Sequence, residues 1–239
     1  MCFTPIISLS VAIIEFILAT ILILFFKRTT LRNFFILFIF VLGFYQFSEF
    51  MLCSTEYSLL WAKIGFITYT FLPGIFLHAT LRFLKRKPNI FLIYIVPVVI
   101  SIIALLTPGF IIEARCETVF VTVTSIFALA YGFLENLPFL IYNCYYFGFI
   151  ILSLSLIMKD YFHEKNRIKK EIELVEMIGG LLMTVPTLIF IVVLPYLKQR
   201  FPSVLCSFAL FMAIAAFIAV YLEKKIISKK SSLKSKKKT

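Results

Sequence analysis

Apolar segments long enough to cross a lipid bilayer recur along this chain. A helix of about 20 apolar residues spans the hydrocarbon core, where only structures that pair all of their backbone polar groups are stable. The chain has 239 residues, of which 62% are hydrophobic and 15% charged. It therefore predicts an all-α membrane protein in which residues 1–224 form a seven-transmembrane helix bundle. The spans are expected at about residues 5–26, 34–53, 59–84, 90–106, 137–158, 172–197 and 203–223.

The segments between the spans predict how the bundle is oriented. Of the 24 lysines and arginines, 20 would lie on one side of the membrane. They occur in the segments 27–33, 82–87 and 159–170 and in the tail from residue 224. Positively charged loops mark the cytoplasmic side. The N-terminus is then outside and the C-terminus cytoplasmic, as an odd number of crossings requires, and the expected location is the cell membrane.

This arrangement also explains the formal net charge of +12. Lysines are concentrated in the predicted tail, residues 225–239, which could lie on anionic lipid with about 1 kcal/mol gained per cation. Because the topology accounts for the basic excess, we expect no nucleic acid partner. The first span has neither the basic region nor the cleavage site of a signal peptide, so we expect it to be retained.

The cysteines and histidines give little reason to expect a metal site. The five cysteines include no C-x-x-C pair and there are only two histidines, whereas structural zinc sites use four closely spaced ligands of these types. Cys53, Cys116 and Cys206 all fall near the predicted outer face. A disulfide could form among them if the distances allowed it, and the sequence leaves the pairing open.

The longest segment between spans, residues 107–136, is expected on the outer side. It contains TVFVTVT, in which β-branched residues alternate with the period of a strand. A short hairpin or another folded cap over the outer end of the bundle is therefore predicted. On the opposite side, residues 159–176 carry charges at helical spacing, and they are expected to extend the sixth span into the cytoplasm.

Ionisable residues inside the spans are the first candidates for function, because such groups are costly in a membrane. Glu15 is near the middle of the first span, where it either acts in function or remains a neutral acid that is hydrogen-bonded between helices. Glu49 and Lys63 fall at the same depth on the second and third spans, which predicts an ion pair. Gln46 is one turn deeper on the face of Glu49. The pair either locks the two helices together or shapes a ligand site.

Two further polar residues and several helix breakers complete the candidates. His78 shares a helix face with Arg82 and serves either in packing or as a proton switch, and Asn143 lies in the fifth span. Proline removes a backbone hydrogen bond and glycine permits close contact between helices. The resulting hinge candidates are Pro73, Gly74, Gly179, Gly180 and Pro186.

The sequence contains no motif of a known enzyme chemistry. Walker, GxSxG, HExxH and Gly-rich phosphate-loop patterns are all missing. YFHEKNR around His163 superficially resembles the phosphorylatable histidine of a kinase, but no dimerisation helices and no ATP-binding domain follow it. We therefore expect a protein that is not an enzyme, without catalytic, cofactor-binding or metal sites, and with His163 in a solvated loop.

Several weak motifs occur in an order that resembles a known family. LLWAKIGFITYTFLPGIFLHATLRFLKRKPNIFLIYIVPVVISIIALLTPG has an aromatic and basic entry to one span, a central proline, and a second span that contains proline. AYGFLENLPFLIYNCYYFGFIILSLSLI, RIKKEIELVEMIGGLLMTVPTLIF and FALFMAIAAFIAVYLEKK follow. From about residue 8 to 224, this order resembles the N-terminal seven-helix sensor region of bacterial membrane histidine kinases. The resemblance implies a sensor module of signal transduction.

The chain differs from that family after the seventh span. In relatives this span leads into a kinase, PAS or diguanylate-cyclase module, whereas about 16 lysine-rich residues follow Glu223 here. We therefore expect a receptor-like module without its own output domain, which responds to an unknown small ligand and acts on a separate signalling protein or as a homodimer.

The sequence is also compatible with functions other than a sensor. The main alternative is a small transporter or permease component in which Glu15 and the Glu49–Lys63 pair line a path. A membrane-embedded enzyme acting on lipid would need clustered acid and base residues, which the spans lack. A truncated remnant without a function of its own is the last hypothesis.

Overall fold

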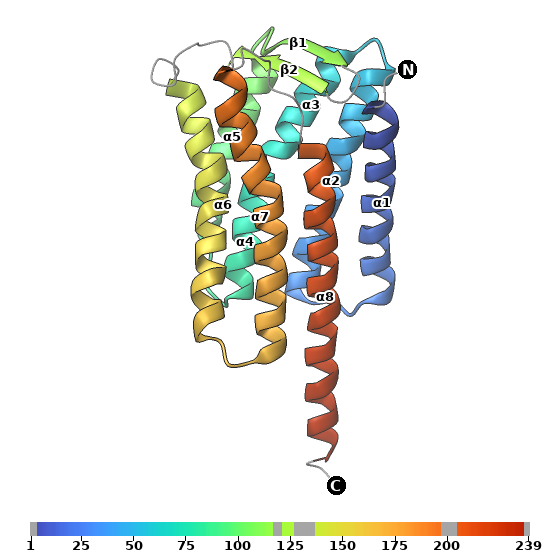
Figure 1. Ribbon diagram of the computed structural model, residues 1–239, viewed down its shortest axis with the longest axis vertical. Helices are drawn as coiled ribbons and strands as arrows, with labels where there is room; N and C mark the ends of the chain where they lie inside the picture. The colour runs from blue at the N-terminus through green and yellow to red at the C-terminus, as the bar shows by residue number, and fades with distance from the viewer. Residues whose placement is uncertain (1–3, 117–120, 127–136, 197–204, 237–239) are drawn as a thin grey trace.

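A helix lies over each of the seven apolar segments of the sequence (Figure 1). The computed structural model describes residues 4–116, 121–126, 137–196 and 205–236. The helices are α1 (Thr4–Phe25), α2 (Thr30–Ser54), α3 (Ser58–Thr70), α4 (Leu72–Phe83), α5 (Ile90–Leu106), α6 (Leu137–His163), α7 (Arg167–Tyr196) and α8 (Leu205–Lys236). Two strands, β1 (Ile111–Cys116) and β2 (Val121–Ser125), lie between α5 and α6. In its described part the protein is therefore all-α except for one hairpin, and the predicted third span is divided into α3 and α4.

The bundle is organised around α2. This helix contacts α1, α3, α4 and α8, as well as strand β1. It begins after Thr29, whose side-chain oxygen accepts a hydrogen bond from the backbone N–H of Arg32 at 3.0 Å, the usual way in which a helix start satisfies a free donor. Because it has several neighbours, α2 buries a wide face along most of its length, while Leu37, Phe40 and Phe44 form an exposed apolar stripe on its other side.

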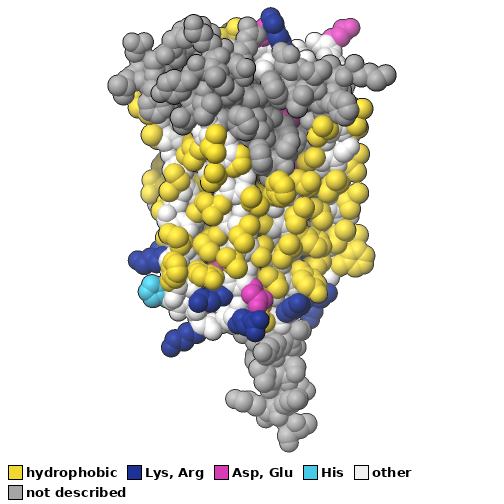
Figure 2. All heavy atoms as spheres, viewed as in Figure 1, with side chains coloured by type: hydrophobic (Ala, Val, Ile, Leu, Met, Phe, Trp, Pro, Cys, Tyr) yellow, Lys and Arg dark blue, Asp and Glu magenta, His cyan; other side chains and the backbone are white. Residues whose placement is uncertain are grey.

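Several helices have the length and composition needed to cross a membrane. Among the described residues four helices meet both conditions, and Ile90–Leu106 is a shorter apolar helix. The four are Pro5–Phe25, Thr30–Ser54, Ser58–Phe83 and Leu140–His163. Figure 2 shows hydrophobic side chains over the middle of the visible face and lysines and arginines gathered near the end from which the C-terminus extends. Exposed large hydrophobic residues are numerous along the helices, with Leu24 and Phe91 each 69% exposed, and an apolar surface of this extent marks contact with a membrane or another protein. The chain is a membrane protein.

The hairpin lies at the end of the bundle where the N-terminus also lies (Figure 1). β1 and β2 pair in antiparallel register with Cys116 opposite Val121, and β1 contacts α3 and α2. Ile111 and Val121 are almost fully buried, so the hairpin packs against the helices. A hairpin was predicted within the cap segment 107–136, and β2 overlaps the alternating stretch that predicted it. Residues 117–120 and 127–136 of that segment lie outside the described part of the chain.

A disulfide attaches the hairpin to the central helix. It joins Cys53, in the last turn of α2, to Cys116, at the end of β1. Their Cα atoms are 5.6 Å apart, a distance typical of disulfides. One of the pairings that the sequence left open is thus present. Cys206 belongs to α8, but its side chain is outside the described part of the structure.

Two adjacent glycines let α7 approach both of its neighbours closely. A Cβ at Gly179 would lie 2.5 Å from the Cβ of Ala215 on α8, and one at Gly180 would lie 2.7 Å from a methyl carbon of Leu154 on α6. Contacts this close require a residue without a side chain. Helix α7 continues without a break through Gly179, Gly180 and Pro186. Gly179 and Gly180 therefore serve in helix packing, and Pro186 lies within a regular helix. That any of the three acts as a hinge remains a prediction.

Helix α8 extends beyond the span predicted for it. The sequence predicted a span that ends at residue 223 and a separate lysine-rich tail, but the helix continues to Lys236 and passes the end of the bundle (Figure 1). The chain contains no glycine or proline after Pro202, and lysine, leucine and isoleucine do not interrupt a helix. Glu223 ties this helix to the α1–α2 turn, because its carboxylate accepts a hydrogen bond of 2.6 Å from the hydroxyl of Thr29.

Replacing Gly179 by Ala is expected to destabilise the bundle, because the added methyl group would overlap Ala215 and push α7 away from α8. Overpacking of this kind typically costs about 1–3 kcal/mol of unfolding free energy. Unfolding of the purified protein in lipid nanodiscs would measure the change. Gly148→Ala on α6 is the matched control, since a Cβ at that position has nothing within 4 Å. Equal losses of stability in both variants would contradict the close contact between α7 and α8.

Candidate ligand site inside the bundle

The third predicted span is interrupted in the middle of the bundle. Helix α3 ends at Thr70 and α4 begins at Leu72, with Pro73 in its first turn. The ring of Pro73 has no N–H, so the hydrogen-bond ladder of α3 cannot continue through it. At the junction the N–H of Phe71 donates to the carbonyl of Thr68 at 3.3 Å, which tightens the last turn of α3. The interruption leaves backbone carbonyls that need other donors.

Tyrosines of α6 supply hydrogen bonds at this interruption. The hydroxyl of Tyr145 donates to the backbone carbonyl of Thr70 at 2.8 Å. The hydroxyls of Tyr142 and Thr70 are 3.1 Å apart and share a second hydrogen bond, while Thr70 also donates to the carbonyl of Phe66 at 2.7 Å. Inside a membrane no water replaces such donors, so a carbonyl left unpaired there would be costly. The position of the α3–α4 junction thus depends on side chains of α6.

The same tyrosines form an aromatic cluster that joins three helices. The ring of Tyr69 on α3 lies edge-on to Tyr45 of α2 at 5.6 Å and to Tyr146 of α6 at 5.9 Å between ring centroids. Phe66 is 5.3 Å from Tyr69 and stacks with Tyr142 at 5.5 Å. Pairs in these arrangements each contribute about 0.5–1.5 kcal/mol beyond their burial. A movement of α3 would therefore be transmitted to α2 and α6.

A small cavity lies beside the junction. It is lined by residues of α2, α4, α6, α7 and α8, namely Phe38, Leu72, Pro73, Phe76, Tyr146, Ile150, Gly180, Met183, Thr184 and Met212. About 10 Å³ is open to the centre of a water molecule, which is room for about one water. Tyr146 is 4% and Thr184 is 5% exposed, and neither hydroxyl has a hydrogen-bond partner. The cavity is apolar, and two residues with unpaired hydroxyls lie around it. Ligand pockets are usually about 300–1,000 Å³, so any ligand larger than water would have to widen this cavity.

A second group of buried polar side chains lies between α1 and α2. Glu15 and Gln46 are both fully buried, and none of their side-chain oxygen and nitrogen atoms has a hydrogen-bond partner. Glu49 accepts a hydrogen bond of 3.4 Å from the hydroxyl of Ser8, and its carboxyl interacts electrostatically with that of Glu15. Gly43 makes room for this group, since a Cβ there would lie 3.3 Å from the Cβ of Glu15. Two predicted candidates thus lie in one interface without any hydrogen bond to hold them.

Lys63 has a different partner from the predicted one. Its ammonium group donates to the backbone carbonyl of Thr107 at 3.3 Å, and no ion pair joins it to Glu49 in this part of the chain. Thr107 is the C-cap of α5, whose last carbonyls lack partners within the helix. α3 packs against α5 as well as α2, so a lysine at this depth can face either neighbour. The prediction rested on the depth of Lys63 and Glu49 in the membrane, and depth alone does not determine which neighbouring helix the side chain of Lys63 faces.

His78 and Asn143 have ordinary environments. The Nδ1 atom of His78 is 3.1 Å from the hydroxyl of Tyr94, and its ring lies against Phe34 with 4.5 Å between centroids. Its Nε2 atom has no hydrogen-bond partner. This environment fits the packing role that was one of the two alternatives for His78. Asn143 is partly buried on α6. Gly74 is in ordinary contact with Ile93 and Tyr145.

The amino-acid sequence of the chain matches a family model over most of its length. The model describes the N-terminal 7TM region of histidine kinase, and it matches residues 8–225. The chain belongs to this family. No curated protein and no solved structure matched it. The resemblance based on the order of the motifs, from about residue 8 to 224, is therefore confirmed. This family is the sensor region of histidine kinases and not their catalytic part, so the chain is a membrane sensor module.

Sequence reasoning missed the residues that hold the centre of this histidine kinase 7TM region together. Pro73 was identified as a helix breaker, but Tyr145, Tyr146 and Thr184 were not selected. The available signal was the pair of adjacent tyrosines in an apolar span, because a buried tyrosine hydroxyl usually finds a partner. Which carbonyl Tyr145 meets depends on the packing of α6 against α4, which the sequence alone does not provide.

Tyr145→Phe is expected to destabilise the 7TM region, because the carbonyl of Thr70 would lose its donor inside the membrane. Hydrogen bonds of this type contribute about 0.6 kcal/mol on average and up to about 1.7 kcal/mol in membrane proteins. Tyr146→Phe is the matched control, since it removes a hydroxyl without a partner. It should leave unfolding in detergent unchanged or slightly raise stability. The hydrogen bond would be refuted if both variants had the stability of the parent protein.

Proposed function

We propose that this 7TM region is a multi-pass sensor module of the cell membrane that responds to a small ligand within the bundle. The observation that carries the proposal is the interrupted span at Phe71. There the hydroxyl of Tyr145 donates to the carbonyl of Thr70, and Pro73 lines a small apolar cavity. Tyr146 and Thr184, whose buried hydroxyls have no hydrogen-bond partner, are among the other residues around this cavity. A ligand that bonded to those hydroxyls would change the packing of α4 against α6 and α7. The ligand itself is a small molecule with at least one hydrogen-bonding group.

The proposed orientation has the N-terminus outside and the C-terminus in the cytoplasm. Two features support it from opposite ends of the bundle. The Cys53–Cys116 disulfide is at the end with the hairpin, and disulfides form in oxidising compartments. The cationic segments are at the other end, as the positive-inside rule requires for the cytoplasmic side.

The proposed output leaves through the cytoplasmic end of α8. The carboxylate of Glu223 accepts a hydrogen bond from Thr29 in the α1–α2 turn, so a displacement of α1 and α2 would move α8 where it leaves the bundle. We infer that a separate signalling protein, or a second copy of this chain, reads that displacement. The lysines beyond Glu223 would lie near anionic lipid.

Site-specific photo-crosslinking in the native membrane would test the proposed partner. A crosslinker at Arg167, which is exposed at the proposed cytoplasmic end, should capture a histidine kinase or another signalling protein. The matched control is a crosslinker at Tyr57, which is exposed at the opposite end and should not capture it. Recovery of the chain only as an isolated monomer would overturn the proposal, and capture from Tyr57 alone would overturn the orientation.

A transporter remains the second candidate, and Glu15 is the observation that favours it. A buried carboxyl group without hydrogen-bond partners could carry a proton across the bundle. Glu15→Gln keeps the shape of the side chain and removes the exchangeable proton. If the protein is a sensor, the variant should fold normally and proton-coupled uptake into vesicles should be absent both before and after the change. Uptake that disappears in Glu15→Gln would instead establish transport.

A further inference from the structure

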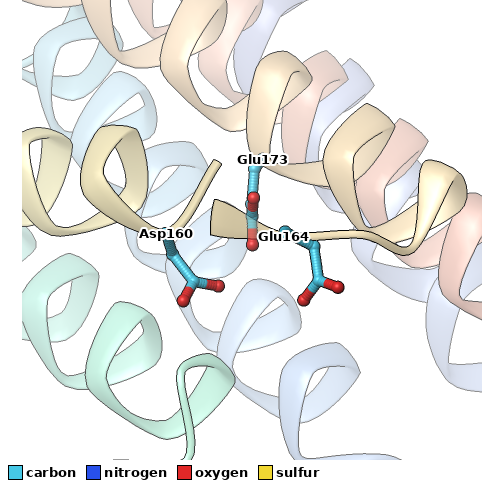
Figure 3. A group of neighbouring side chains, drawn as sticks. All are labelled: Asp160, Glu164 and Glu173. Carbon is cyan, nitrogen blue, oxygen red and sulfur yellow. The ribbon is translucent and has the colours of Figure 1, made fainter. Parts of the chain in front are cut away.

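Three carboxylates converge where α6 is followed by α7, at the end of the bundle opposite the hairpin (Figure 1). Asp160 comes from the last turn of α6, Glu164 from the connecting turn and Glu173 from α7. One carboxylate oxygen of each lies within 4.8 Å of those of the other two. Figure 3 shows Glu173 between Asp160 and Glu164. Two oxygens that bind the same Ca²⁺ ion are separated by up to about 5 Å, and those that bind one Mg²⁺ ion by up to about 4 Å. This spacing therefore permits shared coordination of Ca²⁺, and the smaller Mg²⁺ would require the oxygens to move closer together.

A single ammonium group now serves all three carboxylates. The Nζ atom of Lys169 is paired with Asp160, lies 2.6 Å from Glu164 and lies 3.3 Å from Glu173. The set of four groups has a net charge of −2 when all are ionised. The charge of Arg86 acts on Asp160, and Glu176 is buried near Glu173. One ammonium group is therefore the only cation in direct contact with all three acids among the described residues.

The protonation of the two outer groups is clear from their surroundings. Hydrogen bonds from Lys169 and from the backbone of Asn166 lower the pKa of Glu164 below its ordinary value. Partial burial lowers the pKa of Lys169, but hydrogen bonds to Asp160 and Glu164 outweigh this effect and raise it above its ordinary value. Near neutral pH, Glu164 is thus a carboxylate and Lys169 an ammonium ion.

Glu173 indicates that the ammonium group does not satisfy the cluster. Its side chain is 0% exposed, and neither of its carboxylate oxygens accepts a hydrogen bond. The contact of 3.3 Å with Lys169 brings the charges together without the alignment of a hydrogen bond. Glu173 is therefore held by the ion pair alone, whereas buried carboxylates usually also accept hydrogen bonds. The buried group points at the position that Asp160 and Glu164 also face.

We propose that Asp160, Glu164 and Glu173 bind a divalent cation, which replaces the ammonium group of Lys169. All three ligands are carboxylate oxygens, which suit Mg²⁺, Ca²⁺ and Mn²⁺ rather than zinc. Lys169 is partly exposed, and its long side chain can turn toward the lipid headgroups when the cation enters. The expectation of no metal site was based on cysteine and histidine ligands, and it did not consider acids that are brought together by a helix turn.

Cation binding to the purified full chain would test this inference without reference to any sensor function. Isothermal titration with MgCl₂, CaCl₂ or MnCl₂ at constant ionic strength should give saturable binding to one site per chain. Glu164→Gln should weaken binding by about tenfold or more, since it removes a charged ligand. Glu171→Gln is the matched control, because Glu171 is exposed and paired with Arg167 outside the cluster.

Lys169→Met gives the sharper result. If Lys169 competes with the cation, the variant should bind it about tenfold or more tightly, because the competing charge is gone. A purely structural ion-pair cluster predicts instead that the variant loses stability and that the cation does not restore it. The proposal is overturned if neither the parent nor Lys169→Met shows saturable binding, or if Glu171→Gln weakens binding as much as Glu164→Gln. Should Lys169→Met not fold, the comparison of Glu164→Gln with Glu171→Gln still decides.

Discussion

Inside a membrane every backbone carbonyl needs a hydrogen-bond donor from the protein. The third span is interrupted between α3 and α4, and there a side chain of another helix supplies such a donor. At the junction of α3 and α4 that donor is the hydroxyl of Tyr145. The bond places α6 against α3 and α4, and the neighbouring tyrosines extend the contact to α2. The interrupted span formed by α3 and α4 is therefore stabilised by a hydrogen bond from the neighbouring helix α6. The hydrocarbon environment makes this lateral contact more important than it would be in water.

The helices were predictable because their length is set by the bilayer. A run of about 20 apolar residues has few alternatives in lipid, so segments such as 90–106 coincide with a helix of the same bounds. The extension of α8 was less predictable, since the sequence after Glu223 changes from apolar to basic. That change marks the end of the membrane but does not end a helix, because it contains neither glycine nor proline.

The site was predicted less well, for a physical reason. An apolar helix carries a weak signal for which face meets which neighbour, because nearly all of its faces are hydrophobic. Depth could be estimated, and it suggested that Lys63 would reach Glu49, whereas rotation about the helix axis directs Lys63 to Thr107. The pairing of Cys53 with Cys116 could not be predicted either, because it depends on how the cap folds. The acidic cluster was overlooked because its members are spread over two helices and the turn between them.

The disulfide between Cys53 and Cys116 closes a ring of chain with a sequence separation of 63 residues. This ring contains α3, α4 and α5, and its closed end is at the hairpin. The disulfide therefore fixes one end of this ring and leaves its other end free to move. A change at the Phe71 junction cannot be absorbed by the hairpin swinging away, because the hairpin is fixed to α2. Displacement must appear at the free end of the ring, where α4 turns into α5 close to the basic residues.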